Sequence, residues 1–442
     1  MSKGTVKWLS DLISVEGLGE LVGSIEIVSK SSTNLCLLCK GGRMLCGKVR
    51  CPIIVKAQSM IKYEPLLNDH IHGSTPPSVF VGRIGYPKVY IGPMIPPYFG
   101  STEILDTPED WIGKSIYDII DYRFSLIRGK VRMSIFNAQR GDRLLETLQE
   151  LAMGERSIDA EAVFMKRPRK VLSLSEETQP FGPSAPLKSL SVGNVSVDRR
   201  IEEAFYDRDL KAADAIYKLY DEGVLVTRIQ RAFSIGMLGI GARRKLVPTR
   251  WSITAVDSII SLKLIDEIKQ YNSIDEYRVY SFKNLDNIFI VILMPGNWSF
   301  EWIEAWFPGT TWNVGGKEPA LMGDYEGYWG RTTYASVGGC YYAARLAVAE
   351  RLRMERKQAS ALLLREIHPG YILPVGVWNV RESVRSALRN APATFDDLNE
   401  AWRYACTKLT IPPEDWIANS SILKRAFFQR KITDYFDRSE LS

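Results

Sequence analysis

Four cysteines fall within one short stretch near the start of the chain. They read Cys-x2-Cys-x6-Cys-x4-Cys, at Cys36, Cys39, Cys46 and Cys51. A Cys-x2-Cys pair lets two thiolates in a tight turn bind one metal ion, and a second pair completes the tetrahedral coordination. Because four thiolates leave no open coordination position, the spacing predicts a structural site for one Zn²⁺ per chain, in a module at about residues 30–55. An iron–sulfur cluster uses the same thiolates, and disulfides are the third interpretation.

A second group of residues that could bind a ligand lies in the middle of the chain. Four cations precede a segment with helical periodicity, at Arg243, Arg244, Lys245 and Arg250. We expect a helix to start near Thr254, and the free backbone N–H groups of a helix start attract phosphate. The pattern therefore indicates a site for a nucleotide or for DNA. A solvated basic loop, with Thr254 and Asp257 forming a capping box, explains the same residues.

The stretch GDYEGYWGRTTYASVGG, residues 323–339, interleaves aromatic, charged and glycine residues. Aromatic rings stack on bases, and a guanidinium can hold a phosphate or a sugar edge. The candidate binding residues here are Tyr325, Trp329 and Arg331. A glycine-rich turn of the core, with aromatic packing, is the alternative. The stretch is not a phosphate loop, because the Gly-Lys-Ser/Thr ending is absent.

Catalysis would depend on carboxylates, because the chain has only three histidines. The first candidates for acid–base work are Asp257, Asp324 and Glu326. No nucleophile elbow and no His-Glu-x-x-His motif is present. The sequence does not establish an enzyme.

The elements that would position these residues are predicted from periodicity, and they give a mixed α+β fold. Leucines at helical spacing predict a helix within 141–155, and the run IFIVILM at 288–294 predicts a buried strand. A further strand is expected within 359–369, and helices are expected from about 337 and about 379. Four tryptophans are interpreted as core residues: Trp298, Trp302, Trp306 and Trp312.

Composition divides the 442 residues into several regions. Glycine- and proline-rich extended chain follows the cysteines, and a Ser/Pro-rich stretch separates it from a helical part. The expected regions are an N-terminal one with irregular β structure (1–165), a linker or docked loop (166–200), a helical region (201–275), an α/β region rich in Trp, Tyr and Gly (276–418), and a mobile tail (419–442).

Charge and hydropathy indicate a globular protein. Hydrophobic residues make up 45% of the chain and charged residues 24%, and the formal net charge is +6. This charge permits contact with nucleic acid without demonstrating it. The longest apolar run is far too short to span a bilayer. We therefore expect a cytoplasmic, nucleoid-associated protein that does not contact a membrane.

The C-terminal tail holds large apolar side chains that need a surface to cover. The octet at 429–436 places an aliphatic residue and two aromatics after a glutamine, as Gln429, Ile432, Tyr435 and Phe436. One 3₁₀-like turn would bring the three apolar side chains onto one side as a plug. The octet resembles the peptide by which replication and repair proteins bind the sliding clamp, proliferating cell nuclear antigen (PCNA). An amphipathic helix packed on its own domain is the alternative.

Three stretches together resemble the archaeal Nre proteins, a DNA-repair family with a zinc-finger-like N-terminus. They are CLLCKGGRMLCGKVRCP near the start, RRKLVPTRWSITAVD (Arg243–Asp257), and GDYEGYWGRTTYASVGG. They occur in the family's order, together with the terminal octet, and the resemblance covers about residues 30–436.

The resemblance implies a DNA repair factor that is tethered to PCNA and that acts on or recognises damaged DNA. It supplies no catalytic residues. An enzyme that acts on a nucleotide or a nucleotide-derived adduct is the alternative function. A non-catalytic adaptor between proteins is a further one.

Overall fold

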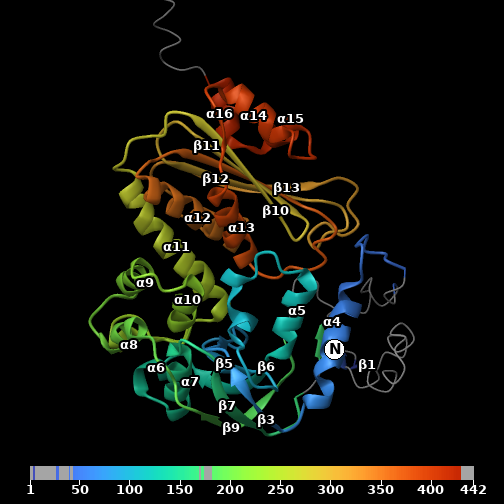
Figure 1. Cartoon of the computed structure of the whole chain (residues 1–442), viewed down its shortest axis with the longest axis vertical. Coiled ribbons are helices and arrows are strands. Elements are labelled where there is room, and N and C mark those ends of the chain that lie inside the picture. Colours follow the sequence, from blue (N-terminus) through green and yellow to red (C-terminus); the bar gives the residue numbers. More distant parts are fainter. Residues whose placement is uncertain are drawn as a thin grey trace, which may run out of the picture.

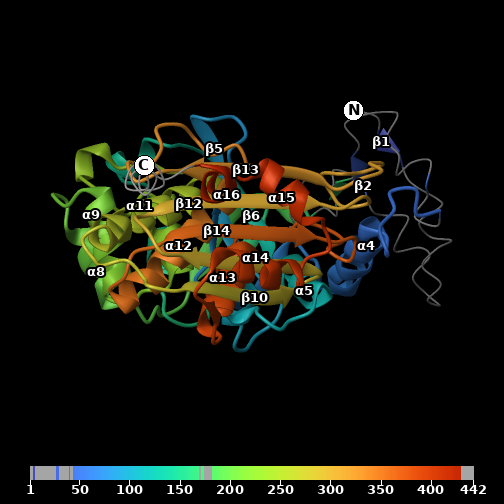
Figure 2. The ribbon, with the colours of Figure 1, turned by 90° about the horizontal axis from the view of Figure 1, so that it is seen from above.

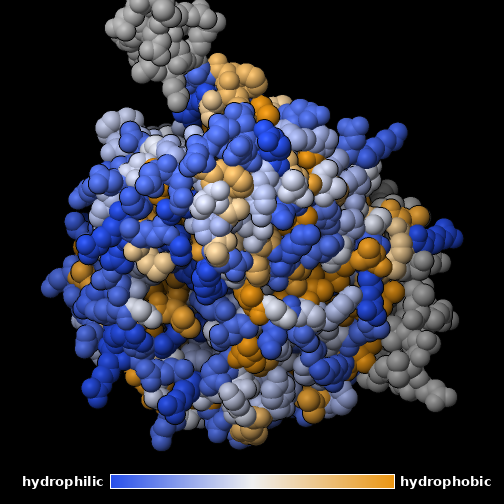
Figure 3. All heavy atoms as spheres, turned by 45° about the horizontal axis from the view of Figure 1, so that its top comes forward, coloured by the Kyte–Doolittle hydropathy of each residue, from blue (hydrophilic) through white to orange (hydrophobic). Residues whose placement is uncertain are grey.

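The computed structural model describes residues 3–4, 26–28, 39, 43–168, 171–173 and 182–429. In this part of the chain, helices and strands are interleaved and the strands form two six-stranded sheets and one three-stranded sheet. The predicted mixed α+β fold is therefore confirmed. Figure 1 shows the two large sheets toward opposite ends of the molecule, with helices between them. Charged and polar side chains dominate the face seen in Figure 3, with smaller apolar patches among them.

The first large sheet has the strand order β3-β7-β9-β6-β5-β4. Its β6–β9 pair is parallel, and its other neighbours are antiparallel. Successive side chains of a strand point to opposite faces, and buried Ile91 and Met133 mark the core face. The strands are β3 (His70–Thr75), β4 (Val79–Val81), β5 (Lys88–Ile95), β6 (Ile127–Ser134), β7 (Ile158–Phe164) and β9 (Ser184–Val192). The small sheet is formed by β1 (Lys3–Gly4), β2 (Glu26–Val28) and β8 (Val171–Ser173).

Helices α7 (Arg143–Met153) and α10 (Val226–Ser234) share a buried apolar cluster with strands β4, β5 and β6 of the first sheet. The predicted leucine helix is confirmed as α7, where the Asp142 carboxylate accepts the Leu145 N–H at 3.1 Å and so caps the first turn. The other helices of this part of the chain are α4 (Pro52–Tyr63), α5 (Ile116–Ser125), α6 (Asn137–Arg140), α8 (Arg199–Tyr206) and α9 (Ala212–Asp221). Short 3₁₀ turns are η1 (Glu64–Leu66), η2 (Glu103–Asp106), η3 (Pro108–Asp110) and η4 (Gly241–Arg243).

The second large sheet has the order β13-β12-β14-β11-β10-β15. Its β12–β14 pair is parallel and its other pairs are antiparallel. Helices cover both of its faces, which explains why β11 is an unbroken apolar run, as the sequence predicts. The strands are β10 (Tyr277–Asn284), β11 (Asn287–Met294), β12 (Ser299–Trp306), β13 (Ala320–Glu326), β14 (Ser360–Ile367) and β15 (Ala393–Phe395).

Two sets of helices sandwich the second sheet (Figures 1 and 2). The inner set, facing the first sheet, is α11 (Thr249–Ile268), α12 (Gly339–Glu355) and α13 (Trp378–Arg389). The outer set is α14 (Leu398–Cys406), α15 (Pro413–Asn419) and α16 (Ser421–Phe428). Apolar residues of β4–β6, α7–α13 and β11 belong to one continuous buried cluster. The inner helices therefore join the two sheets through a shared core.

Some sequence predictions need correction. The helix expected near Thr254 begins at Thr249, directly after Pro248, so Thr254 and Asp257 cannot form its capping box. The core assignment holds for the first three tryptophans, which are at most 8% exposed, but it is wrong for Trp312, which is 52% exposed. The stretch 166–200 contributes strand β9 to the first sheet. No helix among the described residues is long and apolar enough to cross a membrane.

Candidate functional site

The start of α11 presents an exposed cation beside an exposed aromatic pair. Arg250 is exposed, and Trp251 packs on Tyr86 with 5.3 Å between ring centroids. Tyr86 belongs to the turn between β4 and β5, and both rings remain nearly half exposed. The Thr249 hydroxyl accepts the Val81 N–H at 3.0 Å, which fixes the helix start to strand β4. The sequence indicated Arg250 but missed Tyr86, because the contact joins distant segments.

The other predicted cations of this region divide into two kinds. Arg243 and Lys245 are exposed, and the Lys245 ammonium lies 5.2 Å from the Phe136 ring centroid. Arg244 is buried, and its guanidinium donates to the carbonyls of Gly239, Phe205 and Asp207 at 2.7–2.8 Å. Burial lowers its pKa. Arg244 therefore holds the loop in place, while its two neighbours face solvent.

Asp257 lies two turns further along α11 and is fully buried. Its carboxylate accepts from the Gln230 amide at 2.9 Å and from the Arg381 guanidinium at 2.9 and 3.2 Å. Burial raises the pKa of Asp257 to about 6, against the opposing effect of Arg381, so it is ionised at neutral pH. Arg381 also contacts Glu382 at 3.1 Å and Glu109 at 3.9 Å. This buried ionic cluster links α11, α13 and η3.

The two candidate carboxylates of β13 are both paired with arginine. Asp324 accepts from Arg331 at 2.8 Å and from the Ser336 N–H at 2.7 Å. Although burial opposes them, these bonds lower the pKa of Asp324 to about 2. Glu326 is buried and accepts from Arg345 at 2.8 Å, not from Arg331. Asp257, Asp324 and Glu326 are thus all engaged by arginines. The arginines of the two β13 carboxylates, Arg331 and Arg345, both lie against the ring of Tyr341.

Trp329 stands at the tip of the turn after β13 and is 91% exposed. Arg331 holds this turn, because its guanidinium also donates to the carbonyls of Tyr325, Thr333 and Tyr334. The ring of Tyr325 is covered by the Arg425 guanidinium, 4.3 Å from its centroid. Of the three residues predicted to bind a ligand here, Trp329 is the exposed one and Arg331 positions it.

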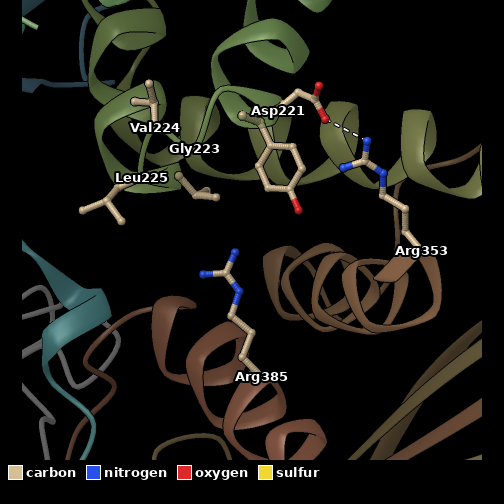
Figure 4. Close-up of a pocket in the computed structure, with 8 residues that line it drawn as sticks. Asp221, Gly223, Val224, Leu225, Arg353 and Arg385 are labelled. Carbon is tan, nitrogen blue, oxygen red and sulfur yellow. Dashed lines mark hydrogen bonds and ion pairs between the residues drawn. The ribbon is translucent and has the colours of Figure 1, made fainter. Parts of the chain in front are cut away.

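A surface cavity of about 250 Å³ lies between the α9–α10 connection and the helices α12 and α13. Figure 4 shows Arg385 reaching toward that connection and Arg353 paired with Asp221. Arg353 also contacts Glu267 at 3.0 Å, and Arg385 contacts Glu350 at 2.5 Å and Glu382 at 2.8 Å. Carboxylates therefore already neutralise both guanidinium groups, and an anionic ligand would have to displace them. Nothing in the sequence predicted this cavity.

The described part of the cysteine stretch contains three of the four predicted ligands. Cys39, Cys46 and Cys51 are buried free thiols, and Cys36 lies outside the described residues. Cys51 occupies the N-cap position of α4. Burial raises the pKa of its thiol, as do Cys39 and Cys46 nearby, against the backbone N–H groups of Ile54 and Ile53. Buried cysteine thiols of this kind are ligands for a metal ion that prefers thiolates, such as zinc. Among described residues, however, no three His, Cys, Asp or Glu side chains are arranged around one metal position.

The predicted clamp peptide lies almost entirely outside the described residues. Of its four specified positions, Gln429 alone is described, and its backbone N–H donates to the Arg425 carbonyl at the end of α16. Ile432, Tyr435 and Phe436 follow it in the chain. The peptide therefore begins directly after the last described helix.

Comparisons with known proteins cover nearly the whole chain. The family model "Archaeal Nre, N-terminal" matches residues 45–313, and "Archaeal Nre, C-terminal" matches residues 326–435. DNA repair protein NreB of Archaeoglobus fulgidus is 44% identical over 391 residues, which cover 88% of this chain and 97% of the relative. NreA of the same organism is 37% identical over 384 residues, covering 87% of this chain and 95% of the relative.

NreA of Haloferax volcanii, also named a DNA repair protein, is 35% identical over 383 residues, which cover 84% of this chain and 90% of the relative. No solved structure matches the chain. The matches span both large sheets and the helices between them. The chain belongs to the archaeal Nre family.

Proposed function

We propose that this protein is a DNA repair factor that contacts DNA at the start of α11 and is tethered to PCNA by its C-terminal peptide. We call the proposed contact the α11 surface. It is made of Tyr86, Arg243, Lys245, Arg250 and Trp251. Three relatives that share most of the chain are named DNA repair proteins, which supports the repair role.

The observation that carries the DNA contact is the exposed Trp251–Tyr86 pair beside Arg250. Among the described residues, no carboxylate pairs with Arg243, Lys245 or Arg250, so their charges are available to phosphates. Neutralising phosphates releases counterions and makes binding fall with salt. An exposed aromatic ring can stack on an unpaired base, as a damaged or branched site would offer.

The clamp tether is proposed from the terminal octet. Ile432, Tyr435 and Phe436 would supply the apolar anchor, and Gln429 would hydrogen-bond beside the pocket. Extended backbone next to the plug can add to a sheet edge of the clamp. The octet follows α16 directly, so it can leave the outer helices without disturbing them.

The zinc module is proposed to have a structural role. Cys36, Cys39, Cys46 and Cys51 would hold the ion, and the metal would fix the loop that carries Gly47 and Lys48. Lys48 donates to the Ile372 carbonyl at 2.9 Å and to the Thr311 hydroxyl at 3.2 Å. Thr311 follows β12 and Ile372 follows β14, so the loop around Lys48 contacts two segments that leave the second sheet.

The test of the DNA contact is fluorescence anisotropy with the full-length protein and a labelled forked DNA. Trp251→Ala should weaken binding by about 1–3 kcal/mol, the usual effect of losing one stacked base. Arg250→Gln should lower the slope of log K against log salt by about 0.7–0.9. The control is Arg403→Gln, an exposed cation on α14. If both variants bind like the control, the proposed α11 surface is wrong.

A further inference from the structure

The face of the first sheet that points away from its core carries a row of cations. On β6, Gly129 and Met133 point to the core, so Arg128, Lys130 and Arg132 share the opposite face. On the neighbouring β5, Tyr90 pairs directly with Arg132. Lys88 lies on the same face of β5. We call Lys88, Tyr90, Lys130, Arg132 and Lys188 the basic sheet face.

The outer part of this face is open to solvent. Lys88, Arg132 and Lys188 are exposed, Tyr90 is 44% exposed, and Lys130 is half-buried. On β9, Pro186 pairs with Lys130, and Lys188 lies two residues further along the same face. The cations therefore occupy three adjacent strands, β9, β6 and β5.

The four cations of the basic sheet face, Lys88, Lys130, Arg132 and Lys188, have no acidic partner among the described residues. Burial and the neighbouring Arg128 lower the pKa of Lys130 to about 8. The acidic residues of the same face, Asp159 and Glu161, lie on β7, beyond β9. The positive potential is therefore concentrated on the β9–β6–β5 side of the sheet.

The basic sheet face borders the α11 surface. A Cβ atom on Gly85, in the turn between β4 and β5, would lie 3.9 Å from the Arg132 guanidinium. The next residue of that turn is Tyr86, which packs on Trp251. One polymer could thus contact both surfaces without leaving the protein.

We propose that the basic sheet face binds single-stranded DNA that continues from the α11 surface. Alternate residues of a strand are about 6.6 Å apart, so Lys130 and Arg132 can meet successive phosphates of an extended strand. Tyr90, directly beside Arg132, can stack on the base between them. A flat sheet face with an aromatic side chain suits unpaired bases, because a duplex keeps its bases stacked inside. This inference rests on the proposed function and adds a site and a substrate class to it.

The test compares full-length variants by anisotropy with a labelled dT20 strand and with the same strand in a duplex. Lys130→Gln/Arg132→Gln should reduce the salt slope for the single strand by about 1.4, which corresponds to two lost phosphate contacts. Tyr90→Ala should raise its Kd at least about fivefold. The exposed pair Lys88→Gln/Lys188→Gln should act in the same direction, so the result does not depend on one half-buried residue. Thermal unfolding checks that each variant is folded.

The matched control is Arg403→Gln/Lys424→Gln, which removes the same charge from exposed positions on α14 and α16. If the sheet-face variants bind dT20 like this control while Trp251→Ala still weakens DNA binding, the sheet-face inference fails and the proposed function stands. An equal loss for duplex and single strand would overturn the assignment to single strands. If the wild-type protein binds neither DNA at low salt, both proposals fail.

Discussion

Replacing Arg381 by Met should reveal how strongly the buried ionic cluster holds α11, α13 and η3 together. Arg381 is 1% exposed and lies 2.9 Å from Asp257, 3.1 Å from Glu382 and 3.9 Å from Glu109. Met fills most of the same volume, so the loss is electrostatic rather than a cavity. Removing one partner of a buried ion pair costs about 3–5 kcal/mol, because the other charge is left uncompensated.

The assay is urea unfolding at pH 7.5, followed by tryptophan fluorescence. With a slope of about 3 kcal/mol/M, the expected loss lowers the midpoint by about 1–2 M. Asp257→Asn/Arg381→Met should be more stable than Arg381→Met alone, because the amide leaves no buried charge at that position. Arg389→Met, at an exposed position of the same helix, is the matched control and should change stability little.

The pH dependence gives the second half of this test. The folded-state pKa of Asp257 is already raised to about 6, and Arg381 is the main group that opposes the rise. Without Arg381 the pKa rises further, so the carboxylate protonates more readily in the folded state than in the unfolded state. The stability deficit of Arg381→Met should therefore be largest above this raised pKa and shrink as pH falls through it. A deficit equal to that of Arg389→Met, or one independent of pH, would refute the reasoning.

Metal analysis of protein purified without added metal should give one zinc per chain. Cys39→Ser should lose the metal and destabilise the N-terminal region. Paired disulfides without metal would exclude a metal site, and iron would identify the site as an iron site instead of a zinc site. Tyr435→Ala/Phe436→Ala should abolish a micromolar PCNA complex, measured by calorimetry, with the melting temperature nearly unaltered; binding equal to wild type would remove the tether. Because phosphate favours the charged form of Lys130, whose pKa is about 8, dT20 affinity should fall as pH rises through 8. Lys130→Gln should make the dT20 affinity less dependent on pH in this range. If the variant keeps the pH dependence of the wild type, the prediction is wrong.

Local patterns in the sequence predicted those elements whose identity depends on neighbours in the chain. The leucine spacing of α7 and the apolar run of β11 are strong signals of this kind. Trp298, Trp302 and Trp306 recur every four residues. This spacing keeps them on one face whether the segment is a helix or a strand. Their burial was therefore predictable, although β12 is a strand. Trp312 follows the end of β12, where the spacing no longer applies.

Contacts between distant segments explain what the sequence could not show. Asp257 and Arg381 are 124 positions apart, and no local pattern connects them. Arg244 and Arg243 are adjacent, yet one is turned inward by three carbonyls and the other faces solvent. The alternation of Arg128, Lys130 and Arg132 is visible in the sequence. That their side of the sheet is open can be known only from the folded chain.

The contact between this protein and DNA can be located most directly by photocrosslinking. A single strand in which thymines are replaced by 5-bromodeoxyuridine is irradiated with the full-length protein, and the crosslinked peptides are mapped by mass spectrometry. Crosslinks are expected at Tyr86, Tyr90 or Trp251, and an excess of unlabelled single strand should suppress them. Crosslinks confined to Trp329 or to the outer helices α14–α16, or no crosslink at all, would contradict this expectation.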